Sequence, residues 1–311
     1  MTIYSFTHTE QDLRRFYQER ASRTLLYIDL AGQVYDAGDT FLGEAQTLAR
    51  SGLVKLPRLF PRADMADIRQ QVEPLIDRRE GLGRVRNHAA ESLENIQAGR
   101  FAYFTQDELQ SVILEDTVSS VSVKQPFTRL PGLARVVFNP NLLGIAAAYL
   151  GTVPVVSYVK VVTSFLNDLA DADTQFWHVD FGSYQILKAL VYLTDVVDLA
   201  SGPFCYVMAS HRQKFPGWDA KSRFTQEEIE TAYPTGRFHH CLGSIGDVWL
   251  ADTTGFHKGL KPTGAPRTAV IVTYTVHPEY GFEYQPIQIP GATYDQLDPF
   301  ARAAADALPI I

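Results

Sequence analysis

Apolar residues recur at helical spacing in several segments of the first half of the chain. In the clearest of these, Met65, Ile68, Val72 and Ile76 follow Pro61, a residue suited to the start of a helix. Similar patterns, each bounded by a capping residue or a glycine, predict three further helices, at residues 9–24, 40–50 and 140–150. Residues 79–126 are only weakly periodic. The first half of the chain is therefore expected to be mostly helical.

Beyond Val153 the pattern changes to short runs rich in valine and aromatic residues, separated by glycine, proline and aspartate. They predict strands at residues 153–165, 175–181, 187–196, 204–208, 247–250 and 268–277, besides an earlier short strand at 53–56. Strands at such short intervals favour a sandwich or barrel over βαβ units. We expect a mainly β fold with α: a double-stranded β-helix (jelly roll) core with N-terminal helices packed against it.

No repeat, low-complexity tract or linker divides the sequence, so residues 1–311 are predicted to form a single domain. Within it we expect a mostly helical part and lid (1–150), the jelly-roll core (151–280) and a C-terminal tail (281–311). The N-terminus lacks the features of a signal peptide, and no stretch is expected to be long and apolar enough to span a bilayer. The chain is therefore predicted to be cytoplasmic and not membrane-bound.

Charge and cysteine content narrow the function classes. The formal net charge of −7, with no stripe rich in arginine and lysine, argues against a nucleic-acid partner. The two cysteines, Cys205 and Cys241, have no zinc-finger spacing and are predicted to be reduced thiols in a reducing compartment.

Candidate chemistry is concentrated around His178. Two residues further on stands Asp180, and alternate residues of a strand point to the same face, so this face carries an imidazole and a carboxylate. Burying both in an aromatic-rich strand is costly unless something satisfies them, and a metal ion would do so. A third ligand is available downstream at His257. Two histidines and one carboxylate with open positions are typical of non-haem Fe(II) oxygenases.

From about Gly52 to His277 the sequence resembles the phytanoyl-CoA dioxygenase (PhyH)-like family of Fe(II)/2-oxoglutarate-dependent oxygenases. Four stretches carry the resemblance, in the order of the family. They are Gln175-Phe176-Trp177-His178-Val179-Asp180, Ser201-Gly202-Pro203-Phe204 continuing to Ser210-His211, Gly246-Asp247-Val248-Trp249 continuing to His257, and Pro266-Arg267.

The resemblance implies a role for each matching residue. His178, Asp180 and His257 match the iron ligands. Arg267 matches the arginine that binds the distal carboxylate of 2-oxoglutarate, and a planar guanidinium suits a carboxylate better than lysine does. Gln175 and Lys160 match positions that could contact 2-oxoglutarate or substrate. Fe(II), 2-oxoglutarate as co-substrate and O2 are the implied cofactors.

The chain also departs from the family pattern. Ser201-Gly202-Pro203 and Met208-Ala209-Ser210-His211 replace the usual Asn-Gly-Pro and Pro-Gly-Ser-His, which changes the turn chemistry before His211. Ala269 stands where many such oxygenases place a hydroxyl group against the 2-oxoglutarate carboxylate, so another residue would have to supply that contact.

The predicted function is oxidation, by default hydroxylation, of a small organic metabolite with release of succinate and CO2. Desaturation, epoxidation and cyclisation are alternative outcomes that the residues do not distinguish. A zinc-dependent hydrolase on the same site and a non-catalytic jelly-roll binding protein are the rival functions. A hydrolase would have no need for Arg267, and a binding protein would have no need for the complete set of three ligands. Neither the primary substrate nor the oligomeric state follows from the residues.

Overall fold

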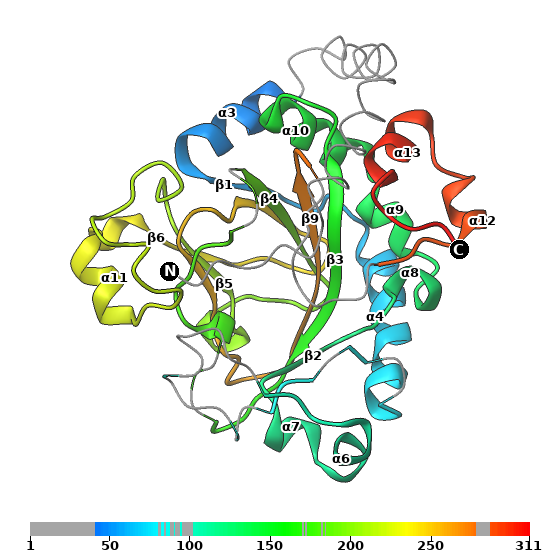
Figure 1. Ribbon diagram of the computed structural model, residues 1–311, viewed down its shortest axis with the longest axis horizontal. Helices are drawn as coiled ribbons and strands as arrows, with labels where there is room; N and C mark the ends of the chain where they lie inside the picture. Colours follow the sequence, from blue (N-terminus) through cyan, green and yellow to red (C-terminus); the bar gives the residue numbers. More distant parts are fainter. Residues whose placement is uncertain are drawn as a thin grey trace.

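The structure is a computed structural model, and it describes residues 41–79, 82–83, 85–87, 90, 94, 102–169, 171, 173–181, 183, 185–277 and 287–311. Two antiparallel sheets form its centre (Figure 1). The larger has the order β1-β7-β4-β9-β3-β2, and the smaller has the order β6-β5-β8. The expected mainly β fold with a jelly-roll core is confirmed.

The longest strands are β3, with 10 residues, and its neighbour β9, with 9 residues. The described strands are β1 (Leu53–Leu56), β2 (Ser120–Ser122), β3 (Val155–Ser164), β4 (Ile186–Tyr192), β5 (Phe204–Val207), β6 (Phe238–Cys241), β7 (Val248–Asp252), β8 (His257–Gly259) and β9 (Arg267–Thr275). Both β1 and β2 come from the first 150 residues, so that part of the chain completes the large sheet.

Helices cover one face of the large sheet, and α11 lies beside the small sheet (Figure 1). The described α-helices are α3 (Leu42–Ser51), α4 (Arg62–Asp77), α6 (Gln106–Ser111), α7 (Leu114–Thr117), α8 (Pro126–Arg129), α9 (Leu133–Val137), α10 (Pro140–Leu150), α11 (Gln226–Ala232), α12 (Gly291–Tyr294) and α13 (Pro299–Ala305). The short 3-10 turns are η2 (Asp173–Gln175), η3 (Leu199–Ser201) and η4 (Thr235–Arg237).

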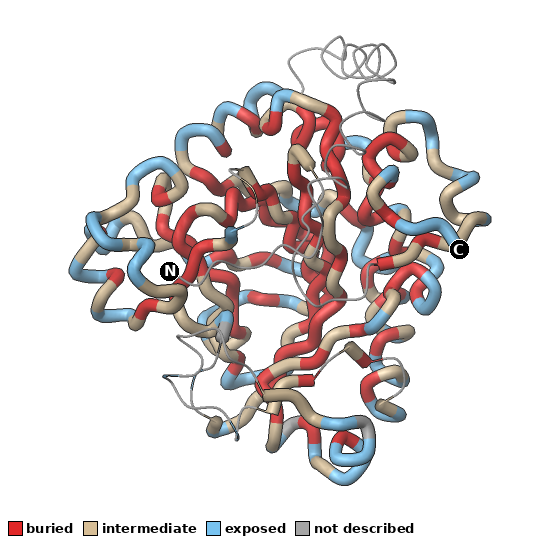
Figure 2. The backbone as a smooth tube through the Cα atoms, in the orientation of Figure 1, coloured by how far each residue is buried: buried red, intermediate tan, exposed pale blue. Residues whose placement is uncertain are grey.

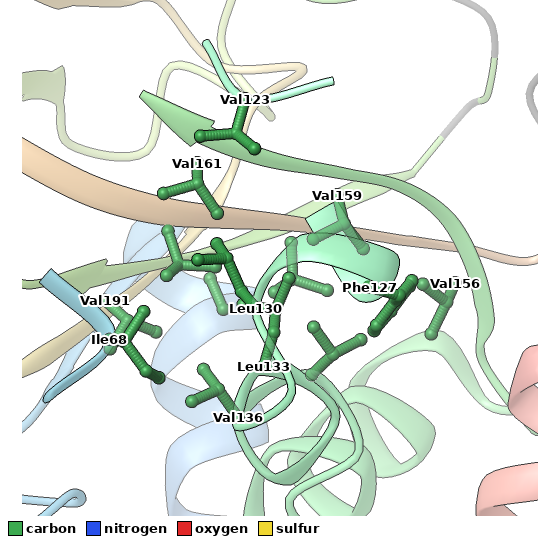
Figure 3. Close-up of a cluster of buried hydrophobic side chains, with 14 of the residues drawn as sticks. Ile68, Val123, Phe127, Leu130, Leu133, Val136, Val156, Val159, Val161 and Val191 are labelled. Carbon is green, nitrogen blue, oxygen red and sulfur yellow. The ribbon is translucent and has the colours of Figure 1, made fainter. Parts of the chain in front are cut away.

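The main core lies between the large sheet and these helices. Ile68 of α4 and Leu133 of α9 pack there against valines of β3, including Val159 and Val161 (Figure 3). Burial is concentrated along the sheet, while the helices expose their outer faces (Figure 2). Because alternate residues of a strand face opposite ways, the other face of the sheet is left to point at the small sheet.

Several predicted boundaries agree with the structure. Gly52, with a φ of 75°, ends α3 and donates its N–H to Leu48 O, as a left-handed C-terminal glycine does. The strand at Leu53–Leu56 and the helix that starts at Pro140 are found at the predicted residues. The predicted helix at 9–24 lies outside the described residues.

Two expectations need correction. The strand predicted around His178 is reduced to two isolated bridges, Trp177 with Phe224 and His178 with His257. The segment Leu133–Leu150 is long and apolar enough to cross a membrane by length and composition alone, with a mean hydropathy of 1.3. However, 61% of it is buried in the fold, so the core accounts for its apolar character.

Candidate metal centre

His178 and His257 are held side by side by their backbones. His178 donates its N–H to His257 O at 3.0 Å, and His257 donates its own to His178 O at 2.9 Å. Residues that exchange both hydrogen bonds stand directly opposite each other with their side chains on one face. The two imidazole rings accordingly lie 4.2 Å apart between centroids.

Asp180 is placed on the same face by its spacing of two residues from His178. Its N–H donates to Thr253 O at 2.8 Å, which fixes the chain at this point to the turn that leads into His257. The ligand atoms of His178, Asp180 and His257 all lie within 4.8 Å of one another. This is the one group of three such side chains close enough for a metal among the residues that the structure describes.

The two histidines present the same ring nitrogen to the centre of the group. His178 Nδ1 is 2.9 Å from Phe176 O, and His257 Nδ1 is 2.9 Å from Gly255 O, so each Nδ1–H donates to a carbonyl. The proton on Nδ1 leaves Nε2 with a free lone pair. His257 Nε2 lies 3.6 Å from Asp180 Oδ2. Backbone carbonyls of this kind fix the tautomer and orientation of metal-ligating histidines.

Burial and charge keep the three groups in their metal-binding forms. Burial lowers the pKa of His257 to about 4 and that of His178 well below its ordinary value, so both imidazoles are neutral at pH 7. Burial raises the pKa of Asp180, but the nearby positive charge, that of Lys188 above all, brings the pKa below its ordinary value. Lys188 Nζ lies 2.6 Å from Asp180 Oδ2. A metal would therefore displace no proton from this site.

Arg267 lies at the start of β9, partly buried, directly opposite Ser164 of β3. Its guanidinium donates to Gly202 O and, at 3.1 Å, to Ser164 Oγ. Both acceptors are neutral, and within the described part of the chain Arg267 has no carboxylate partner. Burial lowers its pKa, which is the cost of keeping this cation away from water.

Ser164, which the sequence did not identify, can supply the hydroxyl group that is missing at Ala269. Ala269 carries no hydroxyl, whereas Ser164 Oγ stands beside the guanidinium of Arg267. Only the pairing of β3 with β9 brings the two together, across about a hundred residues of chain. Lys188 could have been identified from the sequence, because it is the one charged residue in the otherwise apolar strand β4.

The structure places the other candidates more loosely. Gln175 ends η2, which contacts β8, and it is partly buried. Lys160 lies on β3 opposite Ile271, on the same face of the sheet as Arg267 but four residues along the strand from Ser164. His211 lies against Ala49 O at 3.3 Å and is not in the three-residue group. Roles for Gln175 and Lys160 stay predictions.

Residues 48–269 match the family model of phytanoyl-CoA dioxygenase (PhyH). The chain belongs to this family. This family member is a non-haem iron- and 2-oxoglutarate-dependent enzyme, and the predicted resemblance is confirmed. No curated protein sequence matches the chain significantly.

Solved structures share the fold of this PhyH family member at low identity. The epimerase SnoN, in complex with Fe3+, alpha ketoglutarate and nogalamycin RO, is 18% identical with a TM-score of 0.52, over 74% of this chain and 81% of SnoN. The carbocyclase SnoK from nogalamycin biosynthesis is 19% identical with a TM-score of 0.50, over 78% and 92%. EctD from S. alaskensis with bound Fe is 17% identical with a TM-score of 0.50, over 78% and 81%.

Proposed function

We propose that this protein oxidises a C–H bond of a small organic molecule, with hydroxylation as the default outcome and with succinate and CO2 as co-products. The observation that carries the proposal is the group of His178, Asp180 and His257, whose ligand atoms lie within 4.8 Å of one another. We assign these three residues as the ligands of Fe(II), and Arg267 as the residue that binds the distal carboxylate of 2-oxoglutarate.

The donor set fits a divalent iron ion. Two neutral imidazole nitrogens and one carboxylate oxygen form the facial arrangement that leaves coordination positions open. The carbonyls of Phe176 and Gly255 hold each Nδ1, so that neither histidine has to reorient when the metal binds. The mutual backbone pairing of His178 and His257 keeps the two nitrogens at a fixed separation.

The surroundings of Arg267 fit a carboxylate. A partly buried guanidinium that contacts Gly202 O and Ser164 Oγ still has N–H groups to donate, and an anion would restore the interaction energy that burial removes. Ser164 Oγ can donate its own hydrogen to the same carboxylate. Arg267 and Ser164 together therefore form a site for one end of a dicarboxylic acid.

When bound, iron supplies the oxidising chemistry that couples decarboxylation of 2-oxoglutarate with O2 to attack on a C–H bond. The side chains of the protein position the co-substrate and exclude water from the site. Arg267 and Ser164 would hold one end of the co-substrate, while His178, Asp180 and His257 would hold the metal. Phe204, whose ring lies 5.4 Å from that of His257, is one of the apolar side chains that keep water from this histidine.

The two rival functions account for less of the site. A zinc hydrolase would use the three-residue group, but a hydrolase needs no guanidinium opposite Ser164. A binding protein would need neither. Halogenation is also disfavoured, because halide would require the coordination position that Asp180 is assigned to fill.

The outcome of the oxidation is a separate question. SnoN is described as an epimerase and SnoK as a carbocyclase, so the shared fold is compatible with outcomes other than hydroxylation. We propose hydroxylation as the outcome, and we expect residues 79–126 and 181–185 to close over the substrate. Part of both segments lies outside the described residues. The partner is proposed to be a small molecule and not a nucleic acid.

The test begins with an anaerobic titration of the purified protein with Fe(II) and then 2-oxoglutarate. A weak visible charge-transfer band is expected when the co-substrate chelates the metal. Pools of metabolites are then added with O2, and compounds that accelerate succinate formation are identified. The mass of the product separates hydroxylation, which adds an oxygen atom, from cyclisation or desaturation, which removes hydrogen, and from epimerisation, which changes neither.

Two variants and a control make the assignment specific. His178→Ala and His257→Ala should each abolish stoichiometric iron binding, because two remaining ligands form a weak site. His239→Ala is the matched control. His239 lies on β6, partly buried against Trp249 and outside the three-residue group. Iron binding that survives both ligand substitutions would show that the metal is held elsewhere.

A further inference from the structure

The turn between β7 and β8 holds the backbone of all three residues assigned to the metal. It runs from Asp252, the last residue of β7, to His257, which exchanges both backbone hydrogen bonds with His178. Within it, Thr253 O accepts the N–H of Asp180 at 2.8 Å. His178 and Asp180 lie on a segment that forms isolated bridges and no regular strand, so these bonds to the turn decide where the segment lies. A shift of the turn would therefore move the whole group.

The side chain of Asp252 closes this turn. Asp252 is only 2% exposed, and its Oδ1 accepts the N–H of Thr254 at 3.0 Å and the Thr254 hydroxyl at 2.6 Å. An aspartate that bonds the backbone two residues further on folds the chain back in an Asx-turn. The carbonyl of Asp252 accepts the N–H of Gly255 at 3.0 Å, and Gly255 O in turn orients the imidazole of His257. Asp252 thus fixes the path of the chain up to the carbonyl that holds a ligand.

Two tyrosines fasten Asp252 to neighbouring parts of the fold. The hydroxyl of Tyr149, on α10, donates to Asp252 Oδ2. The hydroxyl of Tyr206, on β5, donates to Asp252 O at 2.8 Å. One bond comes from the helical part of the molecule and the other from the small sheet. The turn is therefore tied to elements that are far apart in the sequence.

The contacts of Asp252 indicate how it acts. Both of its side-chain oxygens already accept hydrogen bonds, and within the described residues it forms no ion pair with a lysine or an arginine. It is also not one of the three residues whose ligand atoms gather at the metal-binding group. Resting on the proposed function, we propose that Asp252, held by Tyr149, is a positioning residue for the iron ligands. Through the turn it sets the affinity and the coordination geometry of the metal.

Asp247, just before the first residue of β7, provides a matched control. It is 5% exposed, and its two side-chain oxygens accept the N–H groups of Arg58 at 2.8 Å and of Ser244 at 3.0 Å. It also pairs with Lys55. Asp247 is therefore a buried aspartate that closes a turn next to the same strand, but it has no bond to the turn that carries the ligands. Its loss should destabilise the fold without moving the metal-binding group.

Two imidazole N–H protons serve as reporters that need no metal. His178 Nδ1 lies 2.9 Å from Phe176 O, and His257 Nδ1 lies 2.9 Å from Gly255 O. Buried N–H groups that bond to carbonyls are protected from exchange with water, so both protons should give proton NMR signals in the metal-free protein. Gly255 belongs to the turn and Phe176 does not. Only the signal of His257 should therefore depend on Asp252.

The experiment compares the full-length parent protein with Asp252→Ala, Asp252→Asn and Asp247→Ala. Anaerobic titration measures the Fe(II) affinity of each protein. Co(II), bound in place of iron, reports the coordination geometry through its visible absorption. Urea unfolding of the metal-free proteins gives the stability that each substitution removes, and proton NMR of the same samples follows the two imidazole signals.

Asp252→Ala should weaken Fe(II) binding about 10-fold or more, as the loss of a group that orients metal ligands commonly does. It should also change the Co(II) spectrum and remove the His257 signal, while the His178 signal remains. Asp252→Asn should recover most of the affinity, because the amide oxygen can still accept both bonds from Thr254. Asp247→Ala should lose stability and match the parent in affinity, Co(II) spectrum and both signals.

A second pair of variants tests the tyrosine. Tyr149→Phe removes the donor to Asp252 Oδ2 and should weaken Fe(II) binding, by less than Asp252→Ala does. Tyr274→Phe is its control, because the Tyr274 hydroxyl is buried and donates to Val137 O at 2.7 Å, away from the turn. Its Fe(II) affinity should equal that of the parent.

Two results would overturn the inference. One is an equal fall in Fe(II) affinity in Asp252→Ala and Asp247→Ala, which would make the effect one of general stability. The other is an unchanged affinity and an unchanged His257 signal in Asp252→Ala. Should that variant not fold, Tyr149→Phe compared with Tyr274→Phe decides. A parent protein that binds no Fe(II) would refute the proposed function, whereas the NMR signals of the metal-free proteins would still show whether Asp252 positions His257.

Discussion

Lys188 Nζ lies 2.6 Å from Asp180 Oδ2, so the carboxylate assigned to the metal already has a cation beside it. The two side chains come from different segments and are about three-quarters buried, with 24% and 22% exposed. Lys188 lies on β4 opposite Ala251 of β7, on the face that points at the small sheet. The ion pair keeps Asp180 ionised in a buried site before any metal arrives.

We therefore expect Lys188→Met to destabilise the metal-free protein and to increase the stabilisation that metal binding provides. Without Lys188, the carboxylate of Asp180 loses its nearest cation, at a cost of about 1–3 kcal/mol for a partly buried pair. The metal then supplies the missing positive charge. Thermal unfolding with chelator and with saturating Fe(II), under anaerobic conditions, measures both effects.

Lys55→Met provides the control for this variant. Lys55 forms a comparable ion pair with Asp247, at 2.8 Å, outside the metal-binding group. Its loss should lower the unfolding temperature with and without metal by the same amount. If Fe(II) stabilises Lys188→Met no more than it stabilises Lys55→Met, the ion pair with Asp180 has no link to the metal.

Arg267→Lys should weaken 2-oxoglutarate binding about 10-fold or more, because lysine keeps the charge but loses the paired N–H groups. Ser164→Ala should have a smaller effect in the same direction, since one neutral hydrogen bond is worth about 1 kcal/mol. Iron binding should survive in both. Thr163→Val is the control, because the Thr163 hydroxyl pairs with that of Thr268 at 2.9 Å on the other face of the sheet. If the 2-oxoglutarate titrations of the parent and the three variants superimpose, the carboxylate of 2-oxoglutarate binds elsewhere in the protein.

The sequence predicted the local structure wherever a short-range signal was strong. Gly52 and Pro140 mark helix ends because their backbone preferences act within a turn. Other signals of this kind were present but unused: Thr105 and Thr225 each begin a capping box with a glutamate three residues on, and each starts a short helix. The prediction of periodicity failed there because six or seven residues are too few to show an apolar stripe.

The candidate site divides in the same way. His178 and Asp180 could be found because their spacing of two already places them on one face, and the family pattern added His257 and Arg267. Ser164 could not be found, because its role depends on a strand partner far away in the sequence, Arg267. Register between distant segments is set by tertiary packing, which a single sequence does not display.

Gly202→Ala should weaken 2-oxoglutarate binding as well as the fold. Gly202 has a φ of 65°, and a Cβ there would lie 2.6 Å from Pro262 N and 2.7 Å from Leu260 O, so the backbone would have to move. Gly202 O accepts a hydrogen bond from Arg267, so that movement would displace the guanidinium. Gly217→Ala is the matched control, since Gly217 has a φ of 79° but open space around it. Its cost should be limited to backbone strain, about 1 kcal/mol. Equal 2-oxoglutarate affinities in the two variants would show that Gly202 does not position Arg267.

The metal-free protein should lose stability as the pH falls from 6.5 towards 4. His257 has a folded-state pKa of about 4, below its ordinary value of 6.5, so the unfolded chain takes up a proton in this range and the folded chain does not. The stability from the neutral imidazole is thus fully present above pH 6.5 and is lost as the pH falls through about 4. The difference corresponds to roughly 3 kcal/mol for His257, and His178 shifts in the same direction.

Asp180 affects the stability at lower pH than the histidines do. Because its pKa is depressed in the folded protein, the stability that it contributes is lost only as the pH falls below its ordinary pKa of 3.8. Urea unfolding between pH 7 and pH 4.5, with chelator to keep metal away, therefore excludes the contribution of Asp180. The double variant His178→Gln and His257→Gln should show a clearly shallower fall in unfolding free energy than the parent, because glutamine does not titrate. Parallel curves for the two proteins would mean that the histidines are not held neutral by burial, and that other groups set the acid sensitivity of the fold.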